Sequence, residues 1–239
     1  MADDKLALAV VIPIYNEEEN VTPLLAELMP ILDGLKLSFE VLCINDASSD
    51  RSLELLTELQ KTYPRLWVIS HSINCGESAA TATGFQQASG EFIVTMDGDL
   101  QNDPADIPAL LERIKEQPLA AVCGVRRKRE DDWVKRLSSR TANAFRNLIT
   151  GDKIADAGCT FRILRRECLR EIPVFNGMHR FLPTMLRFQG FAVEEMLVNH
   201  RPRTMGVSKY GVGNRLFRGI IDCIAMRWWY RRCLPTRRY

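Results

Sequence analysis

Five apolar runs, rich in β-branched residues, alternate with amphipathic segments along the first half of this 239-residue chain. The runs have the length and composition of buried strands, and they occupy residues 6–13, 39–45, 66–70, 91–96 and 119–125. Between them, the spacing of apolar positions predicts helices over residues 17–32, 50–62, 76–88 and 106–115. This alternation predicts an α/β fold, a mostly parallel, Rossmann-like sheet flanked by helices. Because ligands bind such sheets outside the carboxyl ends of the strands, the loops that follow the strands should hold any site.

The pattern changes after residue 133. A basic helix is expected over residues 133–148, followed by a Gly/Cys/Thr stretch at 156–161, mixed elements and a basic end. Residues 200–239 hold ten Lys and Arg against one acid and so carry a net charge of +9, whereas the whole chain carries +2. A basic end on an acidic body predicts an anionic partner surface, either nucleic acid or membrane.

The basic end also contains apolar residues at helical spacing, followed by aromatic and basic residues. The apolar set is Leu216, Phe217, Ile220, Ile221, Ile224 and Trp228. This pattern is typical of a membrane-interfacial helix, and a helix that packs on the core or forms a homo-oligomer is the alternative. We expect a boundary at residue 212, with residues 213–239 as a basic amphipathic segment. No run reaches the roughly 18 apolar residues of a membrane-spanning helix.

The seven cysteines are widely spaced, without a CxxC pattern, which predicts free thiols in a reducing cytoplasm.

Two carboxylates follow the fourth apolar run directly. In an extended strand alternate side chains share one face, so Asp97, Asp99 and Gln101 can converge at the edge of the sheet. Oxygen ligands of this kind suit Mg²⁺ or Mn²⁺, which often bind through one or two carboxylates together with the phosphates of a substrate. An Asp-Gly-Asp turn without a metal is the alternative.

Three further loops follow predicted strands. In the first, Pro13 leads to Tyr15, an aromatic face for a base, and Glu17, an acceptor for a ribose hydroxyl or an N–H group; helix capping by Asn16 is the alternative. In the second, Asp46 can accept hydrogen bonds from a base or ribose. In the third, Gly76 opens a helix near any bound anion. The chain has no GxGxxG after its first strand and no GxxxxGK[ST] motif, which disfavours dinucleotide enzymes and P-loop NTPases.

These loops, taken in order, resemble those of the inverting family 2 glycosyltransferases, which have the GT-A fold. The shared patterns are P-x-YNE at residues 13–17, [DN]-D-x-S-x-D at 45–50, N-x-G-x-x-x-A at 74–80 and D-x-D at 97–99. Further stretches, at residues 124–126, 133–140, 157–162, 177–183 and 203–210, resemble the polyprenyl-phosphate branch of that family. This branch includes dolichol-phosphate mannose synthases and bacterial undecaprenyl-phosphate sugar transferases.

The resemblance implies inverting transfer of a sugar, expected to be a hexosyl group, from a UDP- or GDP-sugar to a polyprenyl phosphate. Residues 1–212 would then be the GT-A catalytic domain, with Mg²⁺ or Mn²⁺ on Asp97, Asp99 and Gln101. The second pKa of a phosphate monoester lies near about 6, so the acceptor is already anionic and needs no general base. Cationic and hydroxyl groups would gather the lipid phosphate, and a basic lid would close over the diphosphate. The phosphate-gathering residues are Arg126, Arg136 and Ser139, and the lid residues are Arg203 and Lys209.

A lipid acceptor and a basic C-terminal segment together imply a cytoplasmic enzyme bound peripherally to the inner face of an anionic membrane. Two other interpretations remain open: a family 2 transferase that acts on a soluble or glycan acceptor, and a nucleic-acid-binding protein. The second is disfavoured because the tail matches no nucleic-acid-binding fold, so we expect no nucleic-acid partner. Two positions depart from the family pattern: Glu77 makes an anion contact at its helix start less favourable, and Ala47 replaces a typical glycine.

Overall fold

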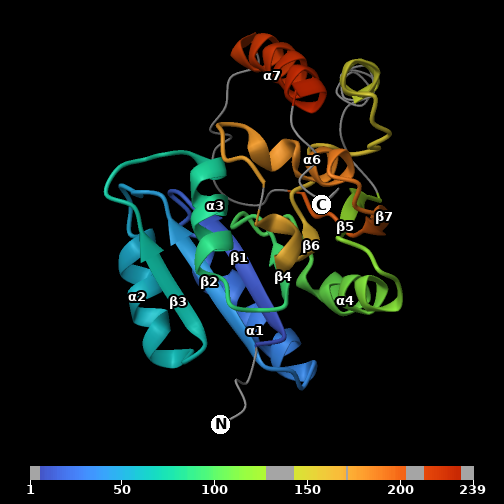
Figure 1. Cartoon of the computed structure of the whole chain (residues 1–239). Coiled ribbons are helices and arrows are strands. Elements are labelled where there is room, and N and C mark those ends of the chain that lie inside the picture. Colours follow the sequence, from blue (N-terminus) through green and yellow to red (C-terminus); the bar gives the residue numbers. More distant parts are fainter. Residues whose placement is uncertain (1–5, 128–142, 171, 203–212, 233–239) are drawn as a thin grey trace.

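A seven-stranded sheet forms the centre of the molecule (Figure 1). The computed structural model describes residues 6–127, 143–170, 172–202 and 213–232, with the backbone alone for residues 213–218. The strand order is β3-β2-β1-β4-β6-β5-β7, and every strand is parallel to its neighbours except β6, which is antiparallel to both β4 and β5. The strands are β1 (Leu8–Ile14), β2 (Phe39–Asn45), β3 (Leu66–Ser70), β4 (Phe92–Thr95), β5 (Ala121–Arg126), β6 (Arg162–Arg165) and β7 (Val193–Val198).

Helices cover both faces of this sheet (Figure 1). They are α1 (Val21–Gly34), α2 (Ser52–Thr62), α3 (Glu77–Gln87), α4 (Ile107–Glu116), α6 (Leu182–Phe188) and α7 (Gly213–Arg232). Residues 143–150 are also helical. Short 3-10 turns lie at η1 (Pro104–Asp106), η2 (Arg166–Leu169) and η3 (Met178–Arg180). The predicted α/β fold is confirmed, and the predicted strands and helices of the first half all occur.

The first predicted helix begins later than expected. Residues 17–20 form a turn, in which the Asn20 and Val21 amides donate to the Glu17 carbonyl oxygen at 2.9 and 3.0 Å. The helix α1 starts at Val21 with no acidic residue in its first turn. Asn16 does not cap it, because the Asn16 side-chain oxygen accepts a hydrogen bond from the Ser49 amide, 2.8 Å away, in the next loop. Of the basic helix expected over 133–148, residues 133–142 lie outside the described residues, and residues 143–148 are helical.

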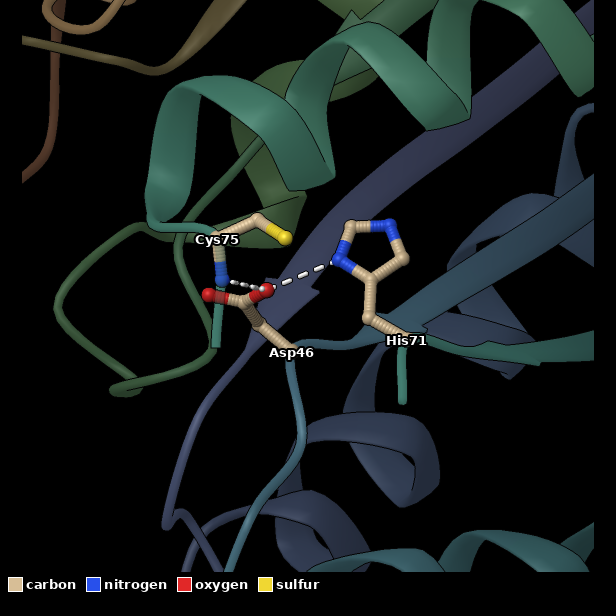
Figure 2. Close-up of side chains that lie close together, drawn as sticks. All are labelled: Asp46, His71 and Cys75. Carbon is tan, nitrogen blue, oxygen red and sulfur yellow. Dashed lines mark hydrogen bonds and ion pairs between the residues drawn. The ribbon is translucent and has the colours of Figure 1, made fainter. Parts of the chain in front are cut away.

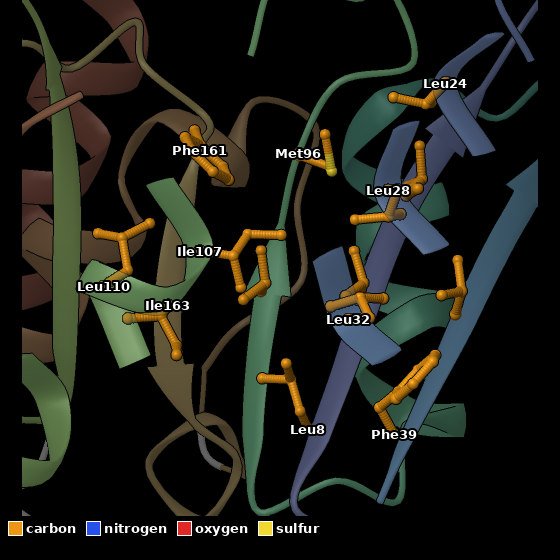
Figure 3. Close-up of a cluster of buried hydrophobic side chains, with 14 of the residues drawn as sticks. Leu8, Leu24, Leu28, Leu32, Phe39, Met96, Ile107, Leu110, Phe161 and Ile163 are labelled. Carbon is orange, nitrogen blue, oxygen red and sulfur yellow. The ribbon is translucent and has the colours of Figure 1, made fainter. Parts of the chain in front are cut away.

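Alternate side chains of the central strands pack into two separate hydrophobic cores, one on each face of the sheet. From β1, Leu8 and Val10 face a core formed with α1, α2 and α4 (Figure 3), whereas Ala9 and Val11 face a second core that includes Ala80 of α3. A strand that is buried on both faces needs apolar residues at every position. This is why the central strands appear in the sequence as continuous apolar runs.

The C-terminal helix α7 lies at the top of Figure 1, beyond α6. It packs on the domain through Cys223 and Met226, which are buried. Part of the predicted apolar stripe faces solvent instead: Ile221, Ile224 and Trp228 are 63%, 56% and 64% exposed. Within the described part of the chain, no helix combines the length and apolarity needed to cross a bilayer.

Gly90, which precedes β4, offers a test of how tightly β1 and β4 pack. A Cβ atom at this position would lie 2.5 Å from the Ala9 backbone nitrogen and 2.6 Å from the Leu8 carbonyl carbon. Because backbone atoms of a central strand cannot move aside, we expect Gly90→Ala to lower the free energy of unfolding by about 2 kcal/mol. Urea denaturation measures this change. Gly34→Ala is the matched control, because nothing lies within 4 Å of its added Cβ, and it should be neutral or slightly stabilising.

Candidate active site

The loops singled out in the sequence all lie at one edge of the sheet. The parallel strands β1, β2, β3, β4, β5 and β7 end at this edge, and the antiparallel strand β6 begins there. The structure therefore brings together the loops after β1 to β4, the stretch that leads into β6 and the segment that follows β7. These segments meet around the end of β4, where the two predicted metal ligands lie.

The loop after β4 is tightly bent and internally bonded. The Asp97 amide donates to the Asn102 side-chain oxygen at 2.8 Å, and the Gln101 amide donates to the Asp99 carboxylate at 3.2 Å. Leu100, between them, has a φ of +63°, in the left-handed region that non-glycine residues seldom adopt. Asp99 is 8% exposed. This loop buries Asp99 and leaves Asp97 half-buried, close enough to Asp99 for their charges to interact.

The surroundings of Asp97 disfavour the ionised form of its carboxylate. Burial, together with the neighbouring Asp99 charge, raises the pKa of Asp97 to about 6. A 2.6 Å hydrogen bond from the Thr160 hydroxyl and the positive charges of Arg162 and Arg126 act in the opposite direction. A divalent cation between the carboxylates would offset both the burial and the repulsion. The donor set of this loop therefore fits Mg²⁺ or Mn²⁺.

Gln101, the third predicted metal ligand, is anchored to the segment after β7. Its Nε2 donates to the Arg201 carbonyl oxygen at 3.1 Å, and the Arg201 amide donates back to the Gln101 carbonyl oxygen at 2.9 Å. The His200 Nε2 atom lies 3.5 Å from the Gln101 Nε2. Because the side-chain nitrogen is engaged, the Gln101 side-chain oxygen is the atom that would face a cation.

The first loop places Tyr15 at the surface and leaves Glu17 half-buried. Tyr15 is 37% exposed. The Glu17 amide donates to the Ser52 hydroxyl at 2.8 Å, and its carboxylate accepts a 2.6 Å hydrogen bond from the Asn20 side chain. Pro13, at the end of β1, lines a small cavity beside Asp97. The aromatic face and the acceptor predicted for a nucleoside are therefore present at the correct edge of the sheet.

The second and third loops are joined through Asp46, which is 2% exposed. Its carboxylate accepts hydrogen bonds from the amides of Cys75 and Gly76, at 2.9 and 2.6 Å, and lies 2.8 Å from the His71 Nδ1. Gly76 has a φ of +88°, which explains the glycine here, since few side chains tolerate this conformation. Asp46, predicted to contact a base or ribose, thus also fixes the start of α3. Ala47, where the family pattern has glycine, is left-handed as well, with a φ of +55°.

A small cavity of about 10 Å³ lies beside Asp97, room for about one water molecule. Charged and polar side chains line it, among them Glu77, Arg162 and His179. His179 is held by the Ser78 hydroxyl, 2.8 Å from its Nδ1, and its Nε2 lies 3.6 Å from the Glu77 carboxylate. Glu77, which departs from the family pattern in sequence, is therefore part of the wall of this cavity beside Asp97.

Arg126, predicted to gather a phosphate, forms a buried ion pair. Its Nε and Nη2 donate to the two oxygens of Asp156, each at 2.7 Å, and the side chains are 14% and 9% exposed. The structure places Arg126 near Asp97, whose pKa it lowers, but with a carboxylate partner of its own. Arg136, Ser139, Arg203 and Lys209 lie outside the described residues.

Several residues of this region were not singled out from the sequence: His71, Asn102, Thr160, Arg162 and Arg201. Arg201 pairs with Glu27 and with Asp103, the latter at 2.9 Å, and so fixes the chain just before the predicted lid. Arg162 is buried, and its Nη2 donates to the Ala157 carbonyl oxygen at 3.5 Å. Thr160, His71 and Arg201 contact predicted ligands from distant segments. Asn102 contacts Asp97 within one loop, and Arg162 acts on Asp97 through its charge. Only the Thr160-Phe161-Arg162 stretch gave a signal, as part of the family pattern at residues 157–162.

Comparison with known proteins adds a second line of support. A family model described as "Glycosyl transferase family 2" matches residues 9–173. A dodecaprenyl-phosphate galacturonate synthase of Rhizobium johnstonii is 34% identical over 233 residues, which cover 95% of this chain and 68% of the relative. An undecaprenyl-phosphate 4-deoxy-4-formamido-L-arabinose transferase of Pectobacterium carotovorum is 36% identical, over 88% of this chain and 64% of the relative. The chain thus spans about two thirds of the length of these relatives.

Solved structures share the fold at lower sequence identity. Glucosyl-3-phosphoglycerate synthase from Mycobacterium tuberculosis, in complex with Mn²⁺, UDP and glucosyl-3-phosphoglycerate, aligns over 92% of this chain and 81% of its own, with a TM-score of 0.68 and 17% identity. TarS from S. aureus, in complex with UDP-GlcNAc, aligns over 97% of this chain and 69% of its own, with a TM-score of 0.62 and 18% identity. The fold of this chain is the GT-A fold of these transferases.

Proposed function

Because the chain belongs to glycosyltransferase family 2, we propose that it transfers a sugar from a nucleotide diphosphate donor to a polyprenyl phosphate, with metal dependence and inversion. The observation that carries the proposal is the close pair of carboxylates, Asp97 and Asp99, at the carboxyl edge of a GT-A sheet. The relatives, which align with most of this chain, are named for a polyprenyl phosphate acceptor. The residues of the site support each part of this reaction.

Donor binding would use three of the loops. Tyr15 offers its exposed ring to the base, while Glu17 and Asp46 offer carboxylate oxygens to N–H groups or to the ribose. Asp97, Asp99 and Gln101 would hold Mg²⁺ or Mn²⁺, which supplies charge neutralisation to the diphosphate leaving group. The two solved transferases were crystallised with UDP or a UDP-sugar, which favours UDP over GDP.

Transfer itself requires little proton chemistry. An oxygen of the acceptor phosphate forms a bond to the anomeric carbon from the face opposite the diphosphate, whose bond to that carbon breaks, so the configuration inverts. The phosphate monoester is largely anionic near pH 7 because its second pKa is about 6, so no side chain must remove a proton. The work left to the protein is to gather two anionic groups, a task we assign to Arg126, Arg136, Ser139, Arg203 and Lys209.

The sugar is the least constrained part of the proposal. We propose a six-carbon sugar, in line with the galacturonate in the name of the Rhizobium relative. The other relatives are named for a substituted arabinose, so the donors to be tested include both types.

The exposed face of α7 supports a membrane location. Ile221, Ile224 and Trp228 lie on this face, and the last turn of the helix holds Arg231 and Arg232. An apolar and aromatic face with basic residues beside it suits the interface of an anionic bilayer, where each Lys or Arg contributes about 1 kcal/mol. We assign residues 213–239 this role and residues 1–212 the catalytic role. A homo-oligomer formed through the same face is the competing arrangement.

We expect Trp228→Ser to reduce binding to phosphatidylglycerol vesicles roughly tenfold, because an apolar side chain that enters the interface contributes more than about 1 kcal/mol. Flotation of the full chain with vesicles measures this. Trp67→Ser is the matched control: Trp67 is 56% exposed but lies on the edge strand β3, and its loss should leave binding unchanged. Equal loss in both variants, or a dimer that dissociates in Trp228→Ser, would contradict the membrane role.

The competing acceptor class is a soluble compound or a glycan. The test offers a panel of UDP- and GDP-sugars with undecaprenyl phosphate, with undecaprenol, which lacks the phosphate, and with soluble glycans. The proposal expects product from undecaprenyl phosphate alone. Product on a glycan, with none on the lipid phosphate, would establish the alternative.

A further inference from the structure

Asp46, His71 and Cys75 form a cluster of three potential metal ligands (Figure 2). It lies at the carboxyl edge of the sheet, after β2 and β3, whereas Asp97 follows β4. The side-chain ligand atoms of the cluster all lie within 4.8 Å of one another. Asp46 follows β2, His71 follows β3, and Cys75 comes two residues before α3. Three sequence-distant positions thus bring a carboxylate, an imidazole and a thiol to one point. The reaction proposed above gives no role to His71 or to Cys75.

We propose that this cluster binds a single transition-metal cation of the Zn²⁺ type, at a site distinct from the one formed by Asp97 and Asp99. A thiolate favours Zn²⁺ over Mg²⁺ or Mn²⁺, which prefer oxygen ligands. Tetrahedral Zn²⁺ with ordinary bond lengths separates its ligand atoms by roughly 3.3 to 3.6 Å. His71 Nδ1 and the Asp46 carboxylate, 2.8 Å apart, must therefore move apart by about 0.5 Å. Cys75, which is exposed, must approach them by about 1 Å at most. The fourth position is left for water.

The hydrogen bonds of His71 suit a metal ligand. Its Nδ1 lies 2.8 Å from the Asp46 carboxylate, and its Nε2 lies 3.0 Å from the Thr83 hydroxyl. A ligating histidine usually donates its second N–H to a neighbouring oxygen, which fixes the ring, and Thr83 is placed to accept that bond. Both ring nitrogens already face oxygen atoms, so His71 is not arranged to take a proton from Cys75 in a nucleophile relay. The arrangement favours metal binding over covalent catalysis.

The binding step balances with one proton released. The Cys75 thiol loses its proton as the sulfur donates an electron pair to the cation. On a neutral His71 the ring proton moves from Nδ1 to Nε2, so that Nδ1 can donate its pair, and this transfer adds no net proton. Asp46 keeps the hydrogen bond from the Gly76 amide through its Oδ2. Its Oδ1 would exchange its contacts with His71 Nδ1 and the Cys75 amide for a bond to the cation.

The other described thiols do not compete for the cation. Burial raises the pKa of Cys43 and Cys123 to about 12 and that of Cys159 to about 11, so these thiols stay protonated near neutral pH. Cys168 and Cys223 are also buried. Among the described residues, Cys75 is the cysteine that solvent can reach. A thiolate-bound metal would therefore report on this cluster.

Cobalt binding tests the proposal, because thiolate-bound Co²⁺ gives a strong near-ultraviolet charge-transfer absorption that oxygen ligands alone do not. We expect the metal-free full chain to develop this band with one equivalent of Co²⁺ and to lose it on addition of Zn²⁺. Cys75→Ser should abolish the band and weaken Zn²⁺ binding at least tenfold. His71→Gln should weaken Zn²⁺ binding as well, and circular dichroism confirms that both variants are folded.

Two control variants localise the signal. Cys233→Ser, which removes a thiol outside the described residues, and Asp99→Asn, which alters the other metal loop, should both retain the band. A wild-type chain without the band, or an undiminished band in Cys75→Ser, would overturn the proposal.

One consequence rests on the proposed function: Zn²⁺ on Asp46 would compete with the donor nucleotide. Because the cobalt band needs no donor, its presence in a chain without transfer activity would separate failure of the proposed function from failure of this inference.

Discussion

Asp97→Asn should abolish sugar transfer and at the same time make the metal-free protein harder to unfold. The loss of activity follows from the proposed site: removing one of the two carboxylates proposed to hold the metal should lower kcat/KM by at least about 10²-fold. The gain in stability follows from electrostatics. A buried carboxylate beside Asp99 destabilises the folded state whenever it is ionised, and an asparagine of the same shape is not ionised.

The size of this gain in stability depends on pH. The folded-state pKa of Asp97 is raised from 3.8 to about 6, so the folded protein binds a proton more tightly than the unfolded chain does. The stability supplied by protonation is present below about pH 4 and is lost as the pH rises through about 6. A shift of about two units corresponds to about 3 kcal/mol at most. The advantage of Asp97→Asn over wild type should therefore approach 2 kcal/mol at pH 7.5 and shrink toward zero at pH 4.

Urea denaturation in EDTA at pH 4, 5.5 and 7.5 measures this difference. Mn²⁺ should reverse the ranking at pH 7.5, because the wild type alone binds the metal tightly. A variant that is less stable than wild type in EDTA at pH 7.5 would contradict the electrostatic account of the carboxylate pair. Asp103→Asn, in the same loop, is the control; it should leave the metal response intact.

The second large effect is expected at Arg126. Arg126→Met removes the guanidinium that pairs with both oxygens of Asp156, and breaking a buried pair in this way costs about 3 to 5 kcal/mol. The double variant Arg126→Met/Asp156→Leu removes both charges and should recover most of that loss. Denaturant unfolding of the four proteins in this cycle measures the coupling between the two side chains.

Activity in the double variant separates a structural role from an acceptor-binding role. If Arg126 also binds the lipid phosphate, the double variant should be stable and should bind UDP or GDP as wild type does, yet transfer should fall by about 10²-fold. Wild-type transfer by a stable double variant would contradict the acceptor role and leave Arg126 as a structural partner of Asp156.

The first half of the fold was predictable because its strands are buried on both faces. Continuous apolar runs such as that of β1 leave little choice of secondary structure. Two strands of the second half were not predicted. β6 is four residues long and contains Arg162, a charge that is buried because the fold offers backbone carbonyl oxygens to its guanidinium. β7 contains Glu194 and Glu195, and the first of these pairs with Arg113 of α4 at 2.9 Å. Tertiary contacts overrode local polarity in both strands.

The candidate site likewise contains residues that could be predicted from the sequence and residues that could not. The residues that we propose contact a ligand stand in short motifs after strands, so Asp97, Asp99 and Asp46 could be predicted from the sequence. Residues distant in sequence hold them in place: the Thr160 hydroxyl donates a hydrogen bond to Asp97, and His71 contacts Asp46. The partner of Arg126 lies 30 residues away, and no local pattern identifies Asp156. Contacts between loops must be seen in three dimensions.

The most direct test of the central claim is transfer of labelled sugar from a panel of UDP- and GDP-sugars to undecaprenyl phosphate in detergent. Wild type and Asp99→Ala are compared, each with Mn²⁺ or with EDTA. We expect a lipid-linked product from one donor, formed only by the wild type and only with the metal. Hydrolysis or binding of donors with no lipid product across the whole panel, or equal product from Asp99→Ala, would contradict the account.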